Sequence, residues 1–219
     1  MRNDEDVKVD IAKQLKWDAR IDASEVSIKV NNGKVELEGN VPTMTAKSAA
    51  FDDAYLVDGV LSVDNKLDVE IPSVKSTPTD SEIRDNVVTA LSINSDVESY
   101  KIDVTVDKGW VTLEGTVNAY WEKVSAENEV LDINGVLGVS NNLGVVPTES
   151  YLDENIAEDI ISALERNVHV NADDIDVKVE DGKVTLDGTV KTYTAKNAAF
   201  DSALYTPGVI TVNNRIIVG

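Results

Sequence analysis

The sequence predicts an α+β protein of three tandem αββαβ domains, each with a three-stranded mixed sheet and two helices packed on one face of it. The first observation behind this prediction is a glycine pattern that occurs three times along the chain. The second is the order of helical and alternating apolar spacing, which is the same at each occurrence. The alternation itself indicates a sheet with one covered face and one solvated face.

The repeat is marked by its glycines, which are spaced by six and then twenty residues in every copy. They are Gly33, Gly39 and Gly59, then Gly109, Gly115 and Gly135, then Gly182, Gly188 and Gly208. The offset is 76 residues from the first copy to the second and 73 from the second to the third, and the apolar positions align at these offsets without a gap. We therefore predict domains at residues 1–72, 79–147 and 151–219, joined by polar linkers at residues 73–80 and 147–150.

Two helices are predicted in each copy. In the first copy, apolar residues at i, i+4 and i+8 within Val7–Leu15 indicate a helix of about three turns. Before the second copy, Thr79 and Glu82 have the spacing of a capping box, which satisfies free amides at a helix start. The alanine-rich stretch Ala46–Val57 predicts the second helix, and Gly59 is expected to end it.

Three strands are predicted in each copy from the alternation of apolar and polar residues. In the first copy, Val26–Val30 and Val35–Glu38 predict a hairpin whose turn contains Gly33, expected at positive φ. Gly39 is expected to mark a bulge or a close approach of two backbones. The last strand is predicted over Leu61–Ile71. The outward phase of the sheet is polar, and it comprises Ser27, Lys29, Glu36, Glu38, Asp64 and Lys66.

One polar residue recurs in the inward phase of the last strand, as Asn65, Asn141 and Asn214. A buried amide needs hydrogen-bond partners. We expect these side chains to bond to neighbouring backbone and so to fix the sheet or a helix end. The alternative is contact with a ligand.

Composition excludes several classes of protein. Of the 219 residues, 40 are acidic and 20 are basic, and the net charge of -20 opposes binding to nucleic acid or to anionic lipid. There is no cysteine, which excludes disulfides and thiolate sites. No stretch reaches the roughly 18 apolar residues of a transmembrane helix. Met1–Asp6 has no apolar signal core, so we expect a cytoplasmic protein as the sequence stands, or a periplasmic one if a leader was removed.

The sequence offers no arrangement typical of an active site, and we expect no enzyme, no cofactor and no metal. His169 is expected to be a surface residue, because the other copies hold Arg20 and Asp96 at its position. The acidic run Asp173–Asp176 is expected to form a solvated face, since it lacks the glycine and glutamate of a calcium loop. Gly33 and Gly39 span a strand and are not followed by the lysine of a phosphate loop.

Four aromatic residues stand out, Trp17, Trp110, Tyr120 and Trp121. The three tryptophans break the repeat, because their aligned positions in the other copies are not aromatic. Tyr120 and Trp121 lie at the start of the second predicted helix of the middle copy. Trp110 takes the outward phase, where the other copies have lysine. Exposed aromatic residues are common in interfaces, so these four are the candidate interface. One alternative is that they pack copy against copy; the other is contact with a partner or a lipid headgroup, centred on the middle domain.

The element order and the closing pattern Gly-Val-x-x-Val-x-Asn resemble the BON domain, a family named for a bacterial osmotically inducible periplasmic protein and for nodulation proteins. The pattern occurs at Gly59–Asn65, Gly135–Asn141 and Gly208–Asn214. The resemblance implies a non-enzymatic binding or scaffolding protein linked to osmotic or envelope stress, with phospholipid or protein partners. Some relatives bind potassium, so the alternative is a module that responds to potassium or calcium.

Overall fold

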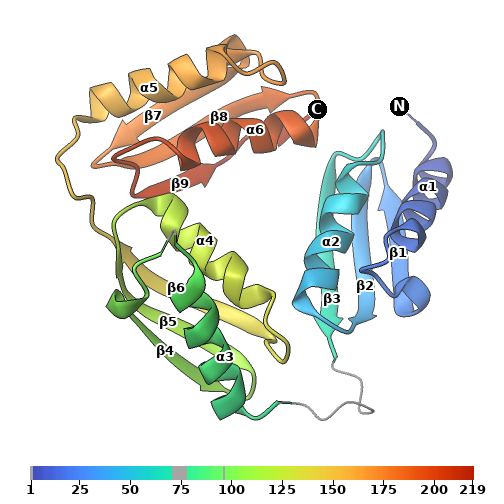
Figure 1. The fold of residues 1–219 in the computed structure, drawn as a ribbon. Coiled ribbons are helices and arrows are strands. Elements are labelled where there is room, and N and C mark those ends of the chain that lie inside the picture. Colours follow the sequence, from blue (N-terminus) through green and yellow to red (C-terminus); the bar gives the residue numbers. More distant parts are fainter. Residues whose placement is uncertain (1, 71–77, 96) are drawn as a thin grey trace. The chain divides into compact units, whose positions relative to one another are not determined.

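The structure is a computed structural model that describes residues 2–70, 78–95 and 97–219 (Figure 1). Repeat 1 comprises α1 (Asp4–Trp17), β1 (Val26–Asn31), β2 (Lys34–Val41), α2 (Met44–Tyr55) and β3 (Ser62–Val69). Repeat 2 comprises α3 (Asp80–Ile93), β4 (Ile102–Asp107), β5 (Trp110–Val117), α4 (Tyr120–Leu131) and β6 (Gly138–Val145). Repeat 3 comprises α5 (Asp153–Glu165), β7 (Ile175–Glu180), β8 (Lys183–Val190), α6 (Tyr193–Leu204), β9 (Thr211–Asn214) and β10 (Ile217–Val218). The predicted fold class is confirmed.

Each sheet is mixed. In repeat 1, β2 is the central strand, antiparallel to β1 and parallel to β3. In repeat 3, β9 and β10 both run parallel to β8 in a single register, with Leu186 opposite Asn214 and Thr189 opposite Ile217. The interruption between β9 and β10 is therefore local and does not shift the pairing.

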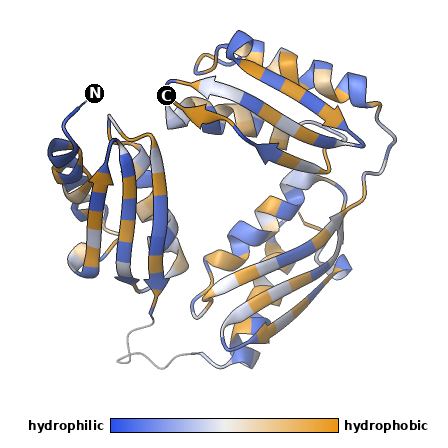
Figure 2. Ribbon diagram, turned by 180° about the vertical axis from the view of Figure 1, so that it is seen from behind, coloured by the Kyte–Doolittle hydropathy of each residue, from blue (hydrophilic) through white to orange (hydrophobic). Residues whose placement is uncertain are grey.

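The core of each repeat lies between the sheet and its two helices. In repeat 1, α1 packs on β1, α2 packs on β3, and the two helices touch each other. The predicted helix face is fully buried through Val7, Ile11 and Leu15, and it meets Val35 and Leu37 of β2. Figure 2 shows hydrophobic and hydrophilic residues alternating along the strands, as expected for sheets with one covered face.

The hairpin turn is held by a contact that the sequence did not suggest. Asn32 and Gly33 have φ of 49° and 73°, the conformation of a tight two-residue hairpin turn. Their two N–H groups donate to the Asp4 carboxylate at 2.7 and 3.1 Å, at the start of α1. Repeats 2 and 3 have the same contact through Asp80 and Asp153, at distances of 2.8 and 2.9 Å in each. We call this contact the turn clasp.

Gly39 marks a close approach of two backbones, as predicted. Its φ is +122°, and a Cβ there would lie 1.9 Å from the carbonyl oxygen of Glu25. The equivalent distances are 2.0 Å at Gly115 and 2.2 Å at Gly188. Any side chain at these positions would therefore push the chain before the first strand away from the sheet.

The predicted capping box at the start of α3 is confirmed. The Thr79 N–H donates to the Glu82 carboxylate at 2.8 Å, and the Glu82 N–H donates to the Thr79 hydroxyl at 3.3 Å. Helix α3 begins at Asp80, the last residue of the predicted first linker. Residues 73–77 of that linker, and Ile71 of the predicted last strand, lie outside the described residues.

Candidate functional site

Trp110 lies on the open face of the sheet in repeat 2, the face that no helix covers (Figure 1). Its side chain is 55% exposed, whereas the next residue, Val111, is fully buried in the core. The indole ring lies against Gly138 of the neighbouring strand β6, where a Cβ would be only 2.4 Å from the ring. One side of the ring therefore covers the glycine, and much of the rest is available to solvent.

The surroundings of Trp110 differ from the same face of repeat 1. The charged residues Lys29, Glu36 and Lys66 of repeat 1 align with Thr105, Thr112 and Asn142 in repeat 2. We define the Trp110 face by six outward residues. They are Thr105, Asp107, Trp110, Thr112, Gly138 and Ser140. None of these six is basic, so the face combines one large aromatic ring with hydroxyl groups and one carboxylate.

The other predicted interface residues lie elsewhere. Tyr120 and Trp121 begin α4, which follows the far end of β5 and packs on the covered side of the sheet. Trp17 is the last residue of α1 in repeat 1 and is 78% exposed. Trp110 and the pair Tyr120 and Trp121 thus belong to different elements of repeat 2, β5 and α4.

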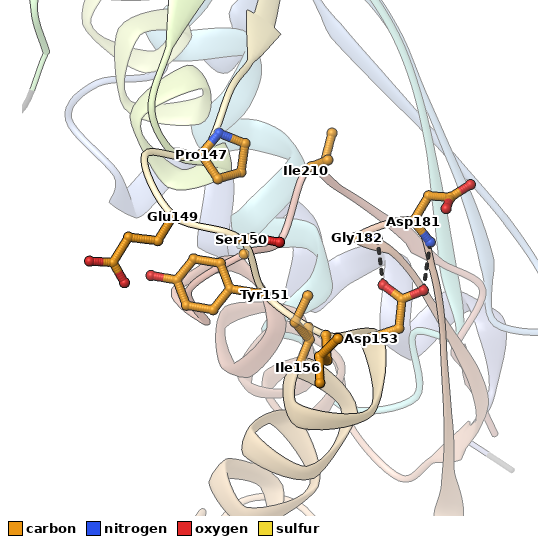
Figure 3. A pocket seen from close by; sticks show the side chains of 11 residues that line it. Pro147, Glu149, Ser150, Tyr151, Asp153, Ile156, Asp181, Gly182 and Ile210 are labelled. Atoms are coloured by element: carbon orange, nitrogen blue, oxygen red, sulfur yellow. Dashed lines mark hydrogen bonds between the residues drawn. The ribbon is translucent and has the colours of Figure 1, made fainter.

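A cavity of about 360 Å³ lies at the start of α5 in repeat 3 (Figure 3). It is lined by Tyr151, Ile210 and the hairpin turn between β7 and β8. Asp153 also lines it, but both oxygens of its carboxylate accept hydrogen bonds from that turn. A carboxylate held in this way is poorly suited to act as a base or a metal ligand. The role of Asp153 is therefore structural: it holds the hairpin turn against the start of α5.

The three repeated asparagines bond to backbone, as predicted. Asn65 donates to the Lys47 carbonyl oxygen of α2 at 2.7 Å and accepts from the Leu67 N–H at 3.2 Å. Asn141 makes the same two contacts in repeat 2, at 2.8 and 3.3 Å. Asn214 accepts from the Ile216 N–H at 3.1 Å. These amides tie the second helix to the last strand in repeats 1 and 2.

The remaining polar candidates lie at the surface. His169 is exposed, as predicted. Asp173, Asp174 and Asp176 are exposed while Ile175 is buried, which confirms the solvated face, although β7 begins only at Ile175. Within the parts of the chain that the structure describes, no group of three or more histidines, aspartates or glutamates could hold a metal ion. No helix in those parts is long and apolar enough to cross a membrane.

Comparisons with known proteins agree with the three repeats. A family model described as the BON domain matches residues 3–71, 79–147 and 152–219. A 21 kDa hemolysin of Actinobacillus pleuropneumoniae is 29% identical over 143 residues, which cover 64% of this chain and 74% of the relative. Osmotically-inducible protein Y of Escherichia coli (strain K12) is 30% identical over 126 residues, and the match covers 56% of this chain and 63% of that protein.

Among solved structures, the C-terminal domain of CdsD, described as the structural protein of the type III secretion system of Chlamydia trachomatis, matches over 100% of both chains. The identity is 16% and the TM-score is 0.27. That score is too low for the arrangement of CdsD to say anything about this chain.

Proposed function

The chain belongs to the BON domain family, and from that premise we propose that it is a non-enzymatic binding or scaffolding protein of the osmotic or envelope stress response. Its partners are a phospholipid surface or another protein, and its domains extend over residues 1–72, 79–147 and 151–219. The similarity to an osmotically inducible protein supports the link to stress. The compartment is the periplasm if a leader is removed from a longer precursor, and the cytoplasm otherwise.

The Trp110 face carries the binding part of the proposal. Interfaces are enriched in tryptophan and depleted in lysine. The Trp110 face has a tryptophan where the other repeats have a lysine, and it contains no lysine. Gly138 lets the indole lie low on the sheet, which leaves a broad surface for contact. The carboxylate of Asp107, together with the net charge of -20, would repel anionic lipid, so a lipid partner should be zwitterionic.

Fluorescence of the full chain tests the lipid version. In a Trp17→Phe, Trp121→Phe background, only Trp110 emits, and its emission should shift to shorter wavelength with phosphatidylcholine or phosphatidylethanolamine vesicles. Phosphatidylglycerol vesicles should give a smaller shift. The matched control keeps Trp17 and replaces the other two tryptophans with Phe.

Photo-crosslinking in osmotically stressed cells tests the protein version. A crosslinker at Ser140 should capture a defined partner, and Trp110→Lys, the residue type of the other repeats, should abolish capture while Trp17→Ala leaves it intact. If the emission of Trp110 does not shift with any vesicle and the capture of a partner does not change in Trp110→Lys, the proposed use of this face is wrong.

The alternative, a module that responds to potassium or calcium, predicts a different result. An ion that binds only the folded state raises the melting temperature as its concentration increases. Melting temperatures that rise equally with potassium and sodium would indicate general screening of the charge of -20. A rise specific to potassium or calcium would support the alternative.

A further inference from the structure

Asp53 of α2 is a carboxyl group in the core of repeat 1, with only 4% of the residue exposed. The Gln14 side-chain amide of α1 donates to its Oδ1 at 3.2 Å. Its Oδ2 is also buried and has no hydrogen-bond partner among the described residues if Asp53 is ionised. A buried carboxylate oxygen without a donor is costly, because ionised groups lose their hydration on burial.

A second carboxyl group lies beside it. Asp18, at the end of α1, is 8% exposed and within hydrogen-bonding reach of Asp53. Arg20 donates to Asp18 from its backbone N–H at 2.8 Å and from its guanidinium at 2.5 to 3.1 Å. One arginine thus neutralises one carboxylate, and two adjacent carboxyl groups in a buried site do not both ionise readily.

We propose that Asp53 is held as a neutral carboxylic acid that donates its hydrogen to ionised Asp18, and that this bond makes repeat 1 lose stability as the pH rises toward neutrality. The carboxylic acid hydrogen of Asp53 would give its Oδ2, which otherwise has no partner among the described residues, a hydrogen bond. It also explains why Asp18, with its arginine, is the ionised member of the pair.

The groups around the pair agree with this assignment. Burial is the main cause that raises the pKa of Asp53, and the hydrogen bond from Gln14 opposes it. The hydrogen bond from Arg20 is the main cause that lowers the pKa of Asp18. Asp52, the other acidic neighbour on α2, also has its pKa raised by burial, and it adds negative charge near Asp53.

The two pKa shifts act in opposite directions. The pKa of Asp53 is raised above 3.8, so its contribution to stability is present at low pH and is lost as the pH rises through the raised value. The pKa of Asp18 is lowered, so its contribution is present above 3.8 and is lost as the pH falls. The combined contribution of this pair is therefore largest between the two values.

The pair of adjacent buried carboxyl groups occurs in repeat 1 and not at the aligned positions of the other two repeats. The aligned pair is Asn94 and Glu129 in repeat 2, and Asn167 and Ser202 in repeat 3. The Ser202 hydroxyl donates to the Ala198 carbonyl oxygen at 2.8 Å. Neither pair brings two carboxyl groups together, so repeat 2 should not share this pH dependence. In repeat 3, burial raises the pKa of Asp201, so the stability of that repeat also falls as the pH rises.

A direct test is a titration of the side-chain carboxyl carbons of the unmodified full chain by NMR. We expect Asp53 to remain protonated at a pH where most aspartates have ionised. Ionisation of Asp53 at or below the ordinary value of 3.8 would overturn the proposal. This measurement needs no substitution, so it stands even if a variant fails to fold.

Hydrogen exchange then tests the consequence. Amide protection of Ile11 and Leu67 in repeat 1, corrected for intrinsic exchange, should fall by up to about tenfold per pH unit while Asp53 ionises. The buried Leu113 of repeat 2 should not follow. Asp53→Asn keeps a donor toward Asp18 and should abolish the fall. The control Asp68→Asn, which removes an exposed charge of the same repeat, should behave as the unmodified chain. An unchanged pH slope in Asp53→Asn would contradict the proposal.

Discussion

The open sheet faces of repeats 1 and 2 have the same strand order but different side chains: the first is charged, and the second is mostly neutral with an exposed tryptophan. In repeat 1, Lys29 pairs with Glu36 and Glu38 at 2.9 and 2.6 Å, and Lys66 pairs with Glu36. In repeat 2, the positions of both lysines and of Glu36 hold neutral hydroxyl or amide side chains, beside an exposed Trp110. Since these faces add nothing to the core, they are free to diverge while the covered face stays the same.

The divergence in repeat 2 also involves two strands together. Trp110 replaces a lysine of β2 and β8, and Gly138 replaces Ser62 of β3 and Thr211 of β9. A side chain at position 138 would collide with the indole ring. The two changes therefore depend on each other. The predictions below separate the shared framework from the divergent faces.

The largest effect should come from the framework glycines. Gly39→Ala and Gly115→Ala each place a Cβ within about 2 Å of a backbone oxygen at positive φ. We expect each to destabilise its own repeat by at least about 3 kcal/mol. Urea unfolding followed by residue-resolved NMR measures this, and a tolerated alanine in either repeat would show that the framework is not shared.

The turn clasp should have the next largest effect, and it should be equal in all repeats. Asp4→Ala, Asp80→Ala and Asp153→Ala each remove two charge-assisted hydrogen bonds at a partly buried turn. We expect a loss of about 1–2 kcal/mol in the repeat concerned. Asn in place of Asp keeps one acceptor oxygen and should recover part of the loss. Asn variants as stable as the unmodified chain would contradict a role for both oxygens.

A smaller effect tests the pairing of Trp110 with Gly138. Gly138→Ser should displace the indole and cost about 1 kcal/mol, and the cost should disappear when Trp110→Lys is added. A double-mutant cycle of unfolding free energies gives the coupling. Additive effects would mean that the ring does not rest on the glycine.

The smallest effect concerns Glu36. Hydrogen bonds from Lys66 and then Lys29 lower its pKa from 4.5 to about 2, so the contribution is present above 4.5 and is lost as the pH falls toward 2. Glu36→Thr, which copies repeat 2, should remove this loss from repeat 1. Exchange protection of Leu37 between pH 5 and 2, compared between the unmodified chain and the Glu36→Thr variant, checks it.

Much of the fold was predictable because the same residue types recur at the same spacing in three copies. Gly33 and Gly39 marked a turn and a close approach, and Val7–Leu15 marked a buried helix face. The turn clasp was missed because a helix-initial aspartate is usually explained by the helix itself. Its signal was nonetheless present, since Asp4, Asp80 and Asp153 recur at the offsets of the glycines.

The candidate site was harder to predict. Trp110 was identified correctly as an outward residue of β5. The surroundings of Tyr120 and Trp121 depend on how α4 packs, which sequence spacing does not give. Asp53 gave no signal, because paired acids are common in a chain with 40 of them. Only burial distinguishes Asp53 from its exposed neighbours, and burial depends on how α1 and α2 pack.

The turn clasp has a consequence for the ends of each repeat. Two adjacent N–H groups in a left-handed turn form a small nest that attracts anions. In each repeat that nest is already filled by a carboxylate from 28 or 29 residues earlier in the chain. A chain shortened to start at Val7 would lack Asp4 and leave these two N–H groups of the first repeat without their carboxylate.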